Sequence, residues 1–299
     1  MRRDQNTDTP LPPEEPAGKN PPDGAILDYW LGAAPAGPVT LEIADSAGKL
    51  VRRFSSAEPP EPADPKAHPV PAYWFRAPQP LSAAPGMHRF VWDLHYPPPA
   101  VLRREYPISA IPGDTPLYPL GPVVPPGRYT VTLTVSGAAF AQPLTVEMDP
   151  RVAAPPEGLK KQFDLAMAIC EELRKDDEAL RQVRRMRDEL ANRRERAKDG
   201  ALLRDIVGLD ARAAELETGG ESEGSLETQG LSRLNARFGT LLEVVEGADA
   251  APTGQAVEAF AQARAALGAK LQRWQELRGR DAEAVNEKLR AANLPPLSL

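Results

Sequence analysis

Three histidines are the side chains in this sequence best suited to hold a metal ion or to act as a base at neutral pH. His88 and His95 belong to one run of alternating residues and are an odd number of positions apart, so their rings point to opposite faces of a strand. They cannot share one ion without a bulge, and His68 sits in a proline-rich loop. We therefore expect surface or loop histidines and no metal site.

The single cysteine, Cys170, is the next candidate for chemistry, because a thiolate is a strong nucleophile. A catalytic thiol needs an electropositive, partly open setting with a histidine base, and all three histidines lie in the other half of the chain. Cys170 also falls on the apolar stripe of a predicted helix. We interpret it as a core residue, and one cysteine forms no internal disulfide framework.

Two pairs of neighbouring carboxylates, Glu171-Glu172 and Asp176-Asp177, raise the question of glycosidase chemistry. Adjacent residues on a helix point roughly 100° apart, and these pairs are interleaved with Arg174 and Lys175. The pattern is typical of a solvated helix face, and we expect these carboxylates to lie there.

The aromatic triple Tyr73-Trp74-Phe75 is the most interesting candidate for a contact surface. Exposed aromatic rings can stack on sugars or anchor a protein partner. The alternative is that a long loop needs a hydrophobic plug to lie on its sheet. We interpret the triple as a plug first and keep the contact surface as a second hypothesis.

Known catalytic signatures do not appear in the sequence. It contains no G-x-S-x-G, Walker-type loop, G-x-G-x-x-G or cysteine–histidine cluster. We therefore predict no catalytic residue, no cofactor and no metal ligand, and a chain that is not an enzyme.

The first half of the chain reads as short strands. Residues 129–135 alternate apolar residues with threonine, Ser136-Gly137 supplies a tight turn, and residues 144–148 alternate back. Similar runs occur at 25–31, 39–43, 50–54 and 86–96, separated by long proline-rich connections. Tyr129 is either a core tyrosine or the equivalent of a tyrosine corner, with its hydroxyl bonded to nearby backbone. These features predict an antiparallel β-sandwich of the immunoglobulin or fibronectin III type at residues 19–150, after a disordered leader at 1–18.

The second half reads as helices. Of 34 prolines, 29 lie at or before Pro150, and none lies between Pro156 and Pro252. Because a proline inside a helix costs about 3 kcal/mol, long helices are confined to this half. Apolar residues recur at helical spacing in four successive stripes, with breaks expected at Gly200, at residues 219–224 and at Pro252. The fourth stripe includes Val257, and Asp281 is the expected cap of a last helix. We predict an antiparallel α-helical bundle at residues 151–299.

Composition excludes some partners. The net charge is -6, and lysine and arginine are mixed among aspartate and glutamate, so there is no basic stripe for nucleic acid. No apolar run approaches the roughly 20 residues of a membrane span. The N-terminal stretch has no apolar core of the kind found in signal peptides, so we expect none there.

Several stretches, taken together, resemble one family. Residues 19–29 (KNPPDGAILDY), 37–43 (GPVTLEI), 86–94 (GMHRFVWDL) and 107–110 (PISA) resemble the C-terminal region of bacterial exoproteins built on BNR/Asp-box, sortilin-like β-propellers. Those proteins are commonly described as glycosyl hydrolases with BNR repeats. The resemblance runs from about Lys19 to Leu297. Within the predicted sandwich, Trp92-Asp93 with Gly121, Val123, Gly127 and Tyr129 is also similar to Ig-like domains of the flagellar hook-capping type.

The resemblance implies a role without supplying an active site. The family's propeller would precede Lys19, and no Ser-x-Asp-x-Gly-x-x-Trp Asp-box occurs in this sequence, so no family site residue is carried over. The resemblance implies a non-catalytic accessory module in the periplasm or outside the cell. Such a module would contact a protein partner, such as a β-propeller chain, or a carbohydrate. Two alternatives are part of a glycoside hydrolase with its active site in a separate propeller, and a structural protein that oligomerises through its helices.

Overall fold

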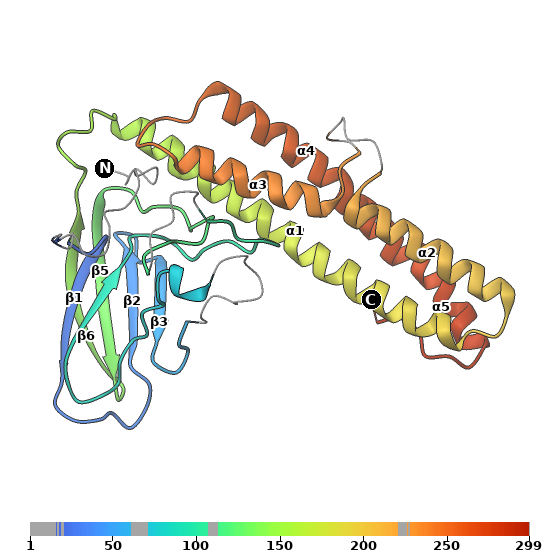
Figure 1. Cartoon of the computed structure of the whole chain (residues 1–299), viewed down its shortest axis with the longest axis horizontal. Coiled ribbons are helices and arrows are strands. Elements are labelled where there is room, and N and C mark those ends of the chain that lie inside the picture. Colours follow the sequence, from blue (N-terminus) through green and yellow to red (C-terminus); the bar gives the residue numbers. More distant parts are fainter. Residues whose placement is uncertain are drawn as a thin grey trace. The chain divides into compact units, whose positions relative to one another are not determined.

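The computed structural model describes residues 16, 18, 21–60, 71–106, 113–220, 226 and 228–298. Within these ranges the chain is mixed α and β, with antiparallel strands followed by helices (Figure 1). The chain folds into two compact units. The strand unit comprises residues 1–98, 104–163 and 246–251, and the helix unit comprises 99–103, 164–245 and 252–299. A domain boundary at residue 150 stays a prediction.

Four of the described strands form the larger sheet of the strand unit. Strands β2 (Thr40–Asp45), β3 (Leu50–Ser55), β5 (Gly127–Val135) and β6 (Ala138–Val146) pair in the order β3-β2-β5-β6, all antiparallel. The β5–β6 hairpin closes through Ser136 and Gly137, with φ of 49° and 83°. Two consecutive positive φ values match the twist of the flanking strands, which confirms the predicted tight turn.

The other two described strands form the smaller sheet. Strands β1 (Ala25–Leu31) and β4 (Gly86–Trp92) pair antiparallel over their whole length. The predicted strand 86–96 ends early because Leu94 has a φ of 61°, which extended backbone does not allow. Past that point the Trp92 indole N–H donates to the His95 carbonyl.

Aromatic residues of the two sheets contact each other. Phe54 on β3 meets Phe90 on β4 at a centroid distance of 4.6 Å, and Trp92 on β4 meets Tyr129 on β5 at 6.0 Å, both edge to face. The apolar residues Leu41 and Ile43 of β2 are buried as well. Such edge-to-face pairs add stability beyond the apolar area that they bury.

The Tyr129 hydroxyl donates to the Pro125 carbonyl at 2.6 Å. The sequence left a core tyrosine and a tyrosine corner as alternatives, and this bond to backbone four residues upstream is the one that a tyrosine corner makes. Burial, with the neighbouring Tyr96 and Asp45, raises the pKa of Tyr129 to about 12, so the hydroxyl stays a donor at neutral pH.

The helices begin and end largely where the sequence indicates. Helix α1 (Pro156–Arg196) is followed by α2 (Gly200–Thr218), α3 (Leu231–Glu246) and α4 (Gly254–Glu276). The Asp199 carboxylate accepts from two backbone N–H groups at the start of α2, and the Thr253 hydroxyl accepts from Ala256 N–H at the start of α4. Gly219, with φ 87°, ends α2.

The last helix differs from the prediction. A π-helical turn, Leu277–Asp281, joins α4 directly to α5 (Ala282–Ala291), and Asp281 has helical backbone angles without a side-chain cap bond. The prediction that Asp281 caps a separate helix is therefore wrong. Its carboxylate pairs with Arg280 and Arg212 instead.

Helices α1 to α5 all contribute to one apolar core in the helix unit. Its fully buried side chains include Leu173, Leu180, Leu209, Phe238 and Leu267. Val257, which the apolar stripe of α4 included, is exposed. Among the described helices, none combines the length and the hydropathy that a membrane span requires.

Candidate interaction surfaces

The predicted aromatic triple forms a turn, called here the aromatic turn (Tyr73, Trp74 and Phe75). A 3-10 helix spans Ala72–Trp74. Tyr73 is 71% exposed and Phe75 is 5% exposed, while Trp74 is half-buried. The rings of Tyr73 and Trp74 stack with centroids 6.4 Å apart, whereas Phe75 packs edge-on against Tyr106 at 5.7 Å.

Backbone contacts fix this turn to a distant segment. The Trp74 carbonyl accepts from the N–H groups of Gly113 and Thr115, at 3.1 and 3.2 Å, and Arg76 N–H donates to the Thr115 carbonyl at 2.8 Å. The Arg76 guanidinium also pairs with Asp114 at 2.8 Å. Phe75 is thus the buried member of the triple, and the backbone bonds of Trp74 and Arg76 hold the turn in a defined conformation.

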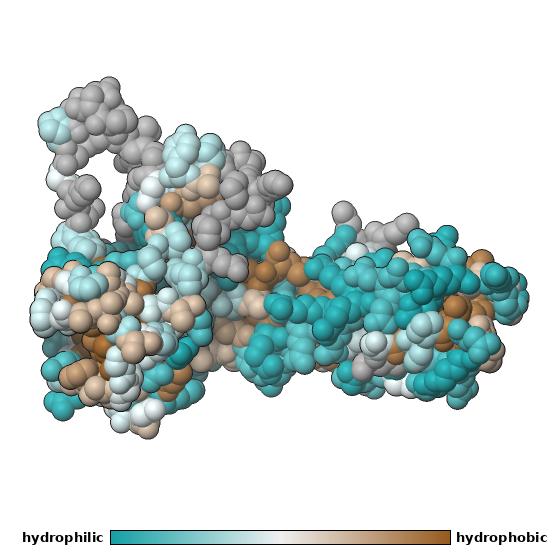
Figure 2. Space-filling model, turned by 90° about the horizontal axis from the view of Figure 1, so that it is seen from below, coloured by the Kyte–Doolittle hydropathy of each residue, from teal (hydrophilic) through white to brown (hydrophobic). Residues whose placement is uncertain are grey.

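A second surface lies on the smaller sheet and is called here the outer face (Ile26, Asp28, Trp30, Met87, Arg89 and Val91). These residues occupy alternate positions of β1 and β4. Of the intervening positions on β4, Phe90 and Trp92 contact rings of the larger sheet. Trp30 is 69% exposed and Met87 is 67% exposed. Apolar surface is visible on the strand unit in Figure 2, while the helices show mostly hydrophilic surface.

Two close contacts order side chains of the outer face. Arg89 binds Asp28 through two hydrogen bonds of 2.9 Å each, a bidentate geometry that restricts both side chains. The Trp30 ring lies against Gly32, where an added methyl group would come within 3.0 Å of ring atom Cη2. The ring position therefore depends on a glycine at this point.

Asp176 does not lie on a solvated helix face, where the sequence predicts it. Its side chain is fully buried in the helix unit, and neither carboxylate oxygen has a hydrogen-bond partner among the described residues. Burial, and to a smaller extent Asp177, raises the pKa of Asp176 to about 7. The Asn235 amide on α3 opposes this shift without making a hydrogen bond of normal geometry.

Glu172 is buried as well, and it pairs with Lys175 at 3.0 Å and with Arg264 on α4 at 3.2 Å. The prediction of a solvated helix face is therefore wrong for Glu172 and Asp176, although Glu171 is exposed. The available signal was position, since Asp176 follows Leu173 by three residues and precedes Leu180 by four, on the same apolar stripe.

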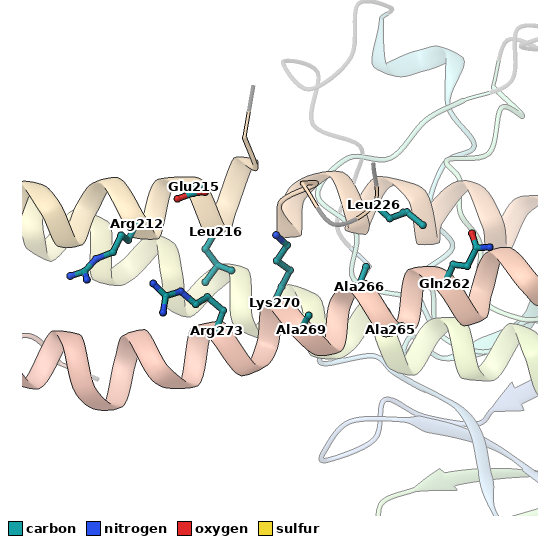
Figure 3. Close-up of a pocket in the computed structure, with 10 residues that line it drawn as sticks. All are labelled: Arg212, Glu215, Leu216, Leu226, Gln262, Ala265, Ala266, Ala269, Lys270 and Arg273. Atoms are coloured by element: carbon teal, nitrogen blue, oxygen red, sulfur yellow. The ribbon is translucent and has the colours of Figure 1, made fainter. Parts of the chain in front are cut away.

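A cavity of about 670 Å³ opens between α2 and α4 (Figure 3). Arg212 lines it from α2 and Lys270 and Arg273 line it from α4, together with three alanines of α4. Its lining contains one carboxylate, Glu215. Glycoside hydrolysis uses two carboxylates about 5 to 10 Å apart, so this lining does not supply the pair.

The described histidines bind backbone. His88 Nε2 lies 2.6 Å from the Ala84 carbonyl, and His95 Nδ1 lies 2.5 Å from the Gly121 carbonyl. His68 lies outside the described residues, as do residues 19–20 and 107–110 of the stretches that carry the resemblance. Within the described ranges, no three histidine, cysteine or acidic side chains are grouped so that they could hold a metal ion. Cys170 packs, partly buried, against the apolar core of the helix unit.

Comparison with known proteins returned no relative: no protein family, no curated protein and no solved structure matches this chain.

Proposed function

We propose that this chain is a non-catalytic interaction module, in which an Ig-like β-sandwich is joined to an α-helical bundle and the sandwich carries the contact surface. Two antiparallel sheets with ring contacts between their facing residues support the sandwich. The Tyr129–Pro125 bond and the buried Trp92 beside Tyr129 support the Ig-like assignment. One apolar core shared by α1 to α5 supports the bundle.

The aromatic turn is the observation that carries this proposal. Two stacked rings, one exposed and one half-buried, on a turn that backbone hydrogen bonds fix lose little conformational entropy when they bind, which favours recognition. Tyrosine and tryptophan are also the residues that most often dominate binding energy in protein interfaces. Tyr73 and Trp74 are the residues that we assign to the contact, and Phe75 anchors them.

The resemblance suggests what the partner is. We propose that the module corresponds to the region that follows the propeller in BNR/Asp-box exoproteins, and that it binds a β-propeller chain or a carbohydrate in the periplasm or outside the cell. The residues that carry this proposal in the described chain are those of β1, β2 and β4.

The test compares the wild-type chain with the double variant Tyr73→Ala/Trp74→Ala. Each is titrated with a purified BNR-type propeller chain and applied to a glycan array. We expect the wild type to bind one of these probes and the double variant to bind at least tenfold more weakly, because the loss of two anchoring rings typically costs about 2 kcal/mol or more.

The matched control is Phe140→Ala, which removes an exposed aromatic side chain from β6. It should leave binding unchanged. Binding that survives the double variant, or sugar release from any glycan by the purified chain, would contradict the proposal.

A further inference from the structure

On the outer face, residues of matching character lie opposite each other on β1 and β4, and each such cross-strand pair is called here a level. The strand register places Ile26 opposite Val91, Asp28 opposite Arg89, and Trp30 opposite Met87. An ion pair thus lies between two apolar levels on one exposed surface.

These three cross-strand pairs are non-hydrogen-bonded pairs, in which the two side chains lie closer together than in hydrogen-bonded pairs. The Arg89 carbonyl and Val91 N–H bond to the side-chain amide of Gln79, at 3.2 and 3.0 Å, and so point away from β1. Residues 89 and 91 are therefore in non-hydrogen-bonded pairs with β1, where side chains are in closest contact. The two side chains of each pair therefore lie side by side on the outer face.

We propose that the outer face binds the outer face of a second copy of this chain. A twofold axis that runs parallel to the strands, between β1 and β4, places each residue of one copy opposite its own cross-strand partner in the other copy. Asp28 then meets the partner's Arg89, Trp30 meets the partner's Met87, and Ile26 meets the partner's Val91. A twofold interface requires this kind of self-complementarity.

Charge complementarity is what selects a second copy over other occupants. In the facing arrangement two aspartates and two arginines alternate, so each charge has an opposite neighbour both within its chain and across the interface. The bidentate pair uses two of the five guanidinium N–H donors of Arg89, which leaves donors for the partner's carboxylate. A uniformly acidic or basic partner would meet a like charge at this level.

The second copy binds the face of the smaller sheet and does not add a strand at the edge of β4. Gln79 already occupies the backbone groups of Arg89 and Val91 on that edge, where an added strand would bind. The face measures roughly 20 Å by 10 Å from strand rise and spacing. An interface of this size is small, so we expect weak, concentration-dependent association.

The test uses the intact chain and sedimentation velocity, and it does not depend on the proposed partner or on the aromatic turn. Wild type is expected to shift from monomer to dimer as its concentration rises to about 500 µM, a range that suits a small interface. Asp28→Arg and Arg89→Asp, each measured without the other, are expected to weaken dimerisation at least tenfold, because like charges then meet across the interface.

Mixing the two variants is the decisive step. Asp28→Arg carries two arginines at this level and Arg89→Asp carries two aspartates, so a mixed dimer restores both opposite-charge contacts. We expect dimer to reappear in the mixture and not in either variant. Circular dichroism is the check that each variant is folded. Trp30→Ala, which removes an exposed apolar side chain of the same face, should weaken dimerisation independently of the charges.

Three outcomes would overturn the proposal: a wild type that stays monomeric throughout the series, a dimer that the single variants leave intact, and a mixture of folded variants that fails to dimerise. Tyr73→Ala/Trp74→Ala should dimerise as wild type does, so failure of this inference and failure of the proposed function are distinguishable.

Discussion

Asp176 shows how one buried charge can set the pH dependence of stability. Its ordinary pKa is 3.8, and burial raises the pKa to about 7 in the folded chain. Between these two values the folded state holds a proton that the unfolded state has lost, so the free energy of unfolding falls as pH rises. About one pH unit above 7 the loss is nearly complete, and it amounts to at most about 4 kcal/mol.

Asp176→Asn should therefore stabilise the chain at high pH. The neutral amide removes the cost of a buried carboxylate, and we expect urea unfolding at pH 8 to show a gain of about 2 kcal/mol or more. The gain should be smaller at pH 5. Glu171→Gln is the control, because Glu171 is an exposed carboxylate on the same helix and pairs with Arg174. A variant less stable than wild type at pH 8 would show that the carboxylate is stabilising as it stands.

The sequence predicted the features of single residues that neighbouring residues determine, but not those that depend on contacts distant in the sequence. The aromatic triple was predicted as a set, but the burial of Phe75 depends on its contact with Tyr106, and the turn is fixed by backbone bonds to residues 113–115, which are distant in sequence. In β1, apolar residues occur on both faces, so alternation does not say that Trp30 points outward.

At the scale of elements, Glu217 ties α2 to α1. Arg184 donates to one carboxylate oxygen at 2.7 Å and Arg187 donates to the other at 2.6 Å. Burial would raise the pKa of Glu217, but the two arginines overcome it and lower the pKa. The pKa of Glu217 is thus shifted in the opposite direction to that of Asp176. The stability that the ionised Glu217 contributes is therefore lost as pH falls.

Glu217→Gln should destabilise the helix unit by roughly 1.5–3 kcal/mol, because it weakens two charge-assisted hydrogen bonds to a buried oxygen pair. Chemical unfolding at neutral pH measures the loss. Glu178→Gln, which alters an exposed pair with Arg174 within α1, should change stability by less than about 1 kcal/mol. Equal effects of the two substitutions would contradict a special role for Glu217.

Most element boundaries were predictable because their causes are local. Period-two alternation indicated the strands, and Gly200, Gly219 and Pro252 marked the helix ends. The join between α4 and α5 was not predictable in the same way. Asp281 resembles a helix cap in sequence, but its carboxylate is taken by Arg212, a residue of α2.

At the scale of the whole molecule, the proposed contacts belong to the strand unit, whereas the helix unit is built around one apolar core. The four tryptophans of the sequence lie at positions that distinguish the proposed contact surfaces from the buried parts of the two units. Trp30 lies on the outer face and Trp74 in the aromatic turn, whereas Trp92 is buried in the strand unit and Trp274 in the helix unit.

The most direct measurement is therefore ¹⁹F NMR of the chain labelled with 5-fluorotryptophan, with resonances assigned by single Trp→Phe variants. Raising the chain concentration should shift the Trp30 resonance, and adding the propeller chain or glycan that binds should shift the Trp74 resonance. The Trp92 and Trp274 resonances should stay in place. Shifts confined to Trp274, or no shift at Trp74 with a probe that binds, would place the contact elsewhere and contradict the assignment of binding to the strand unit.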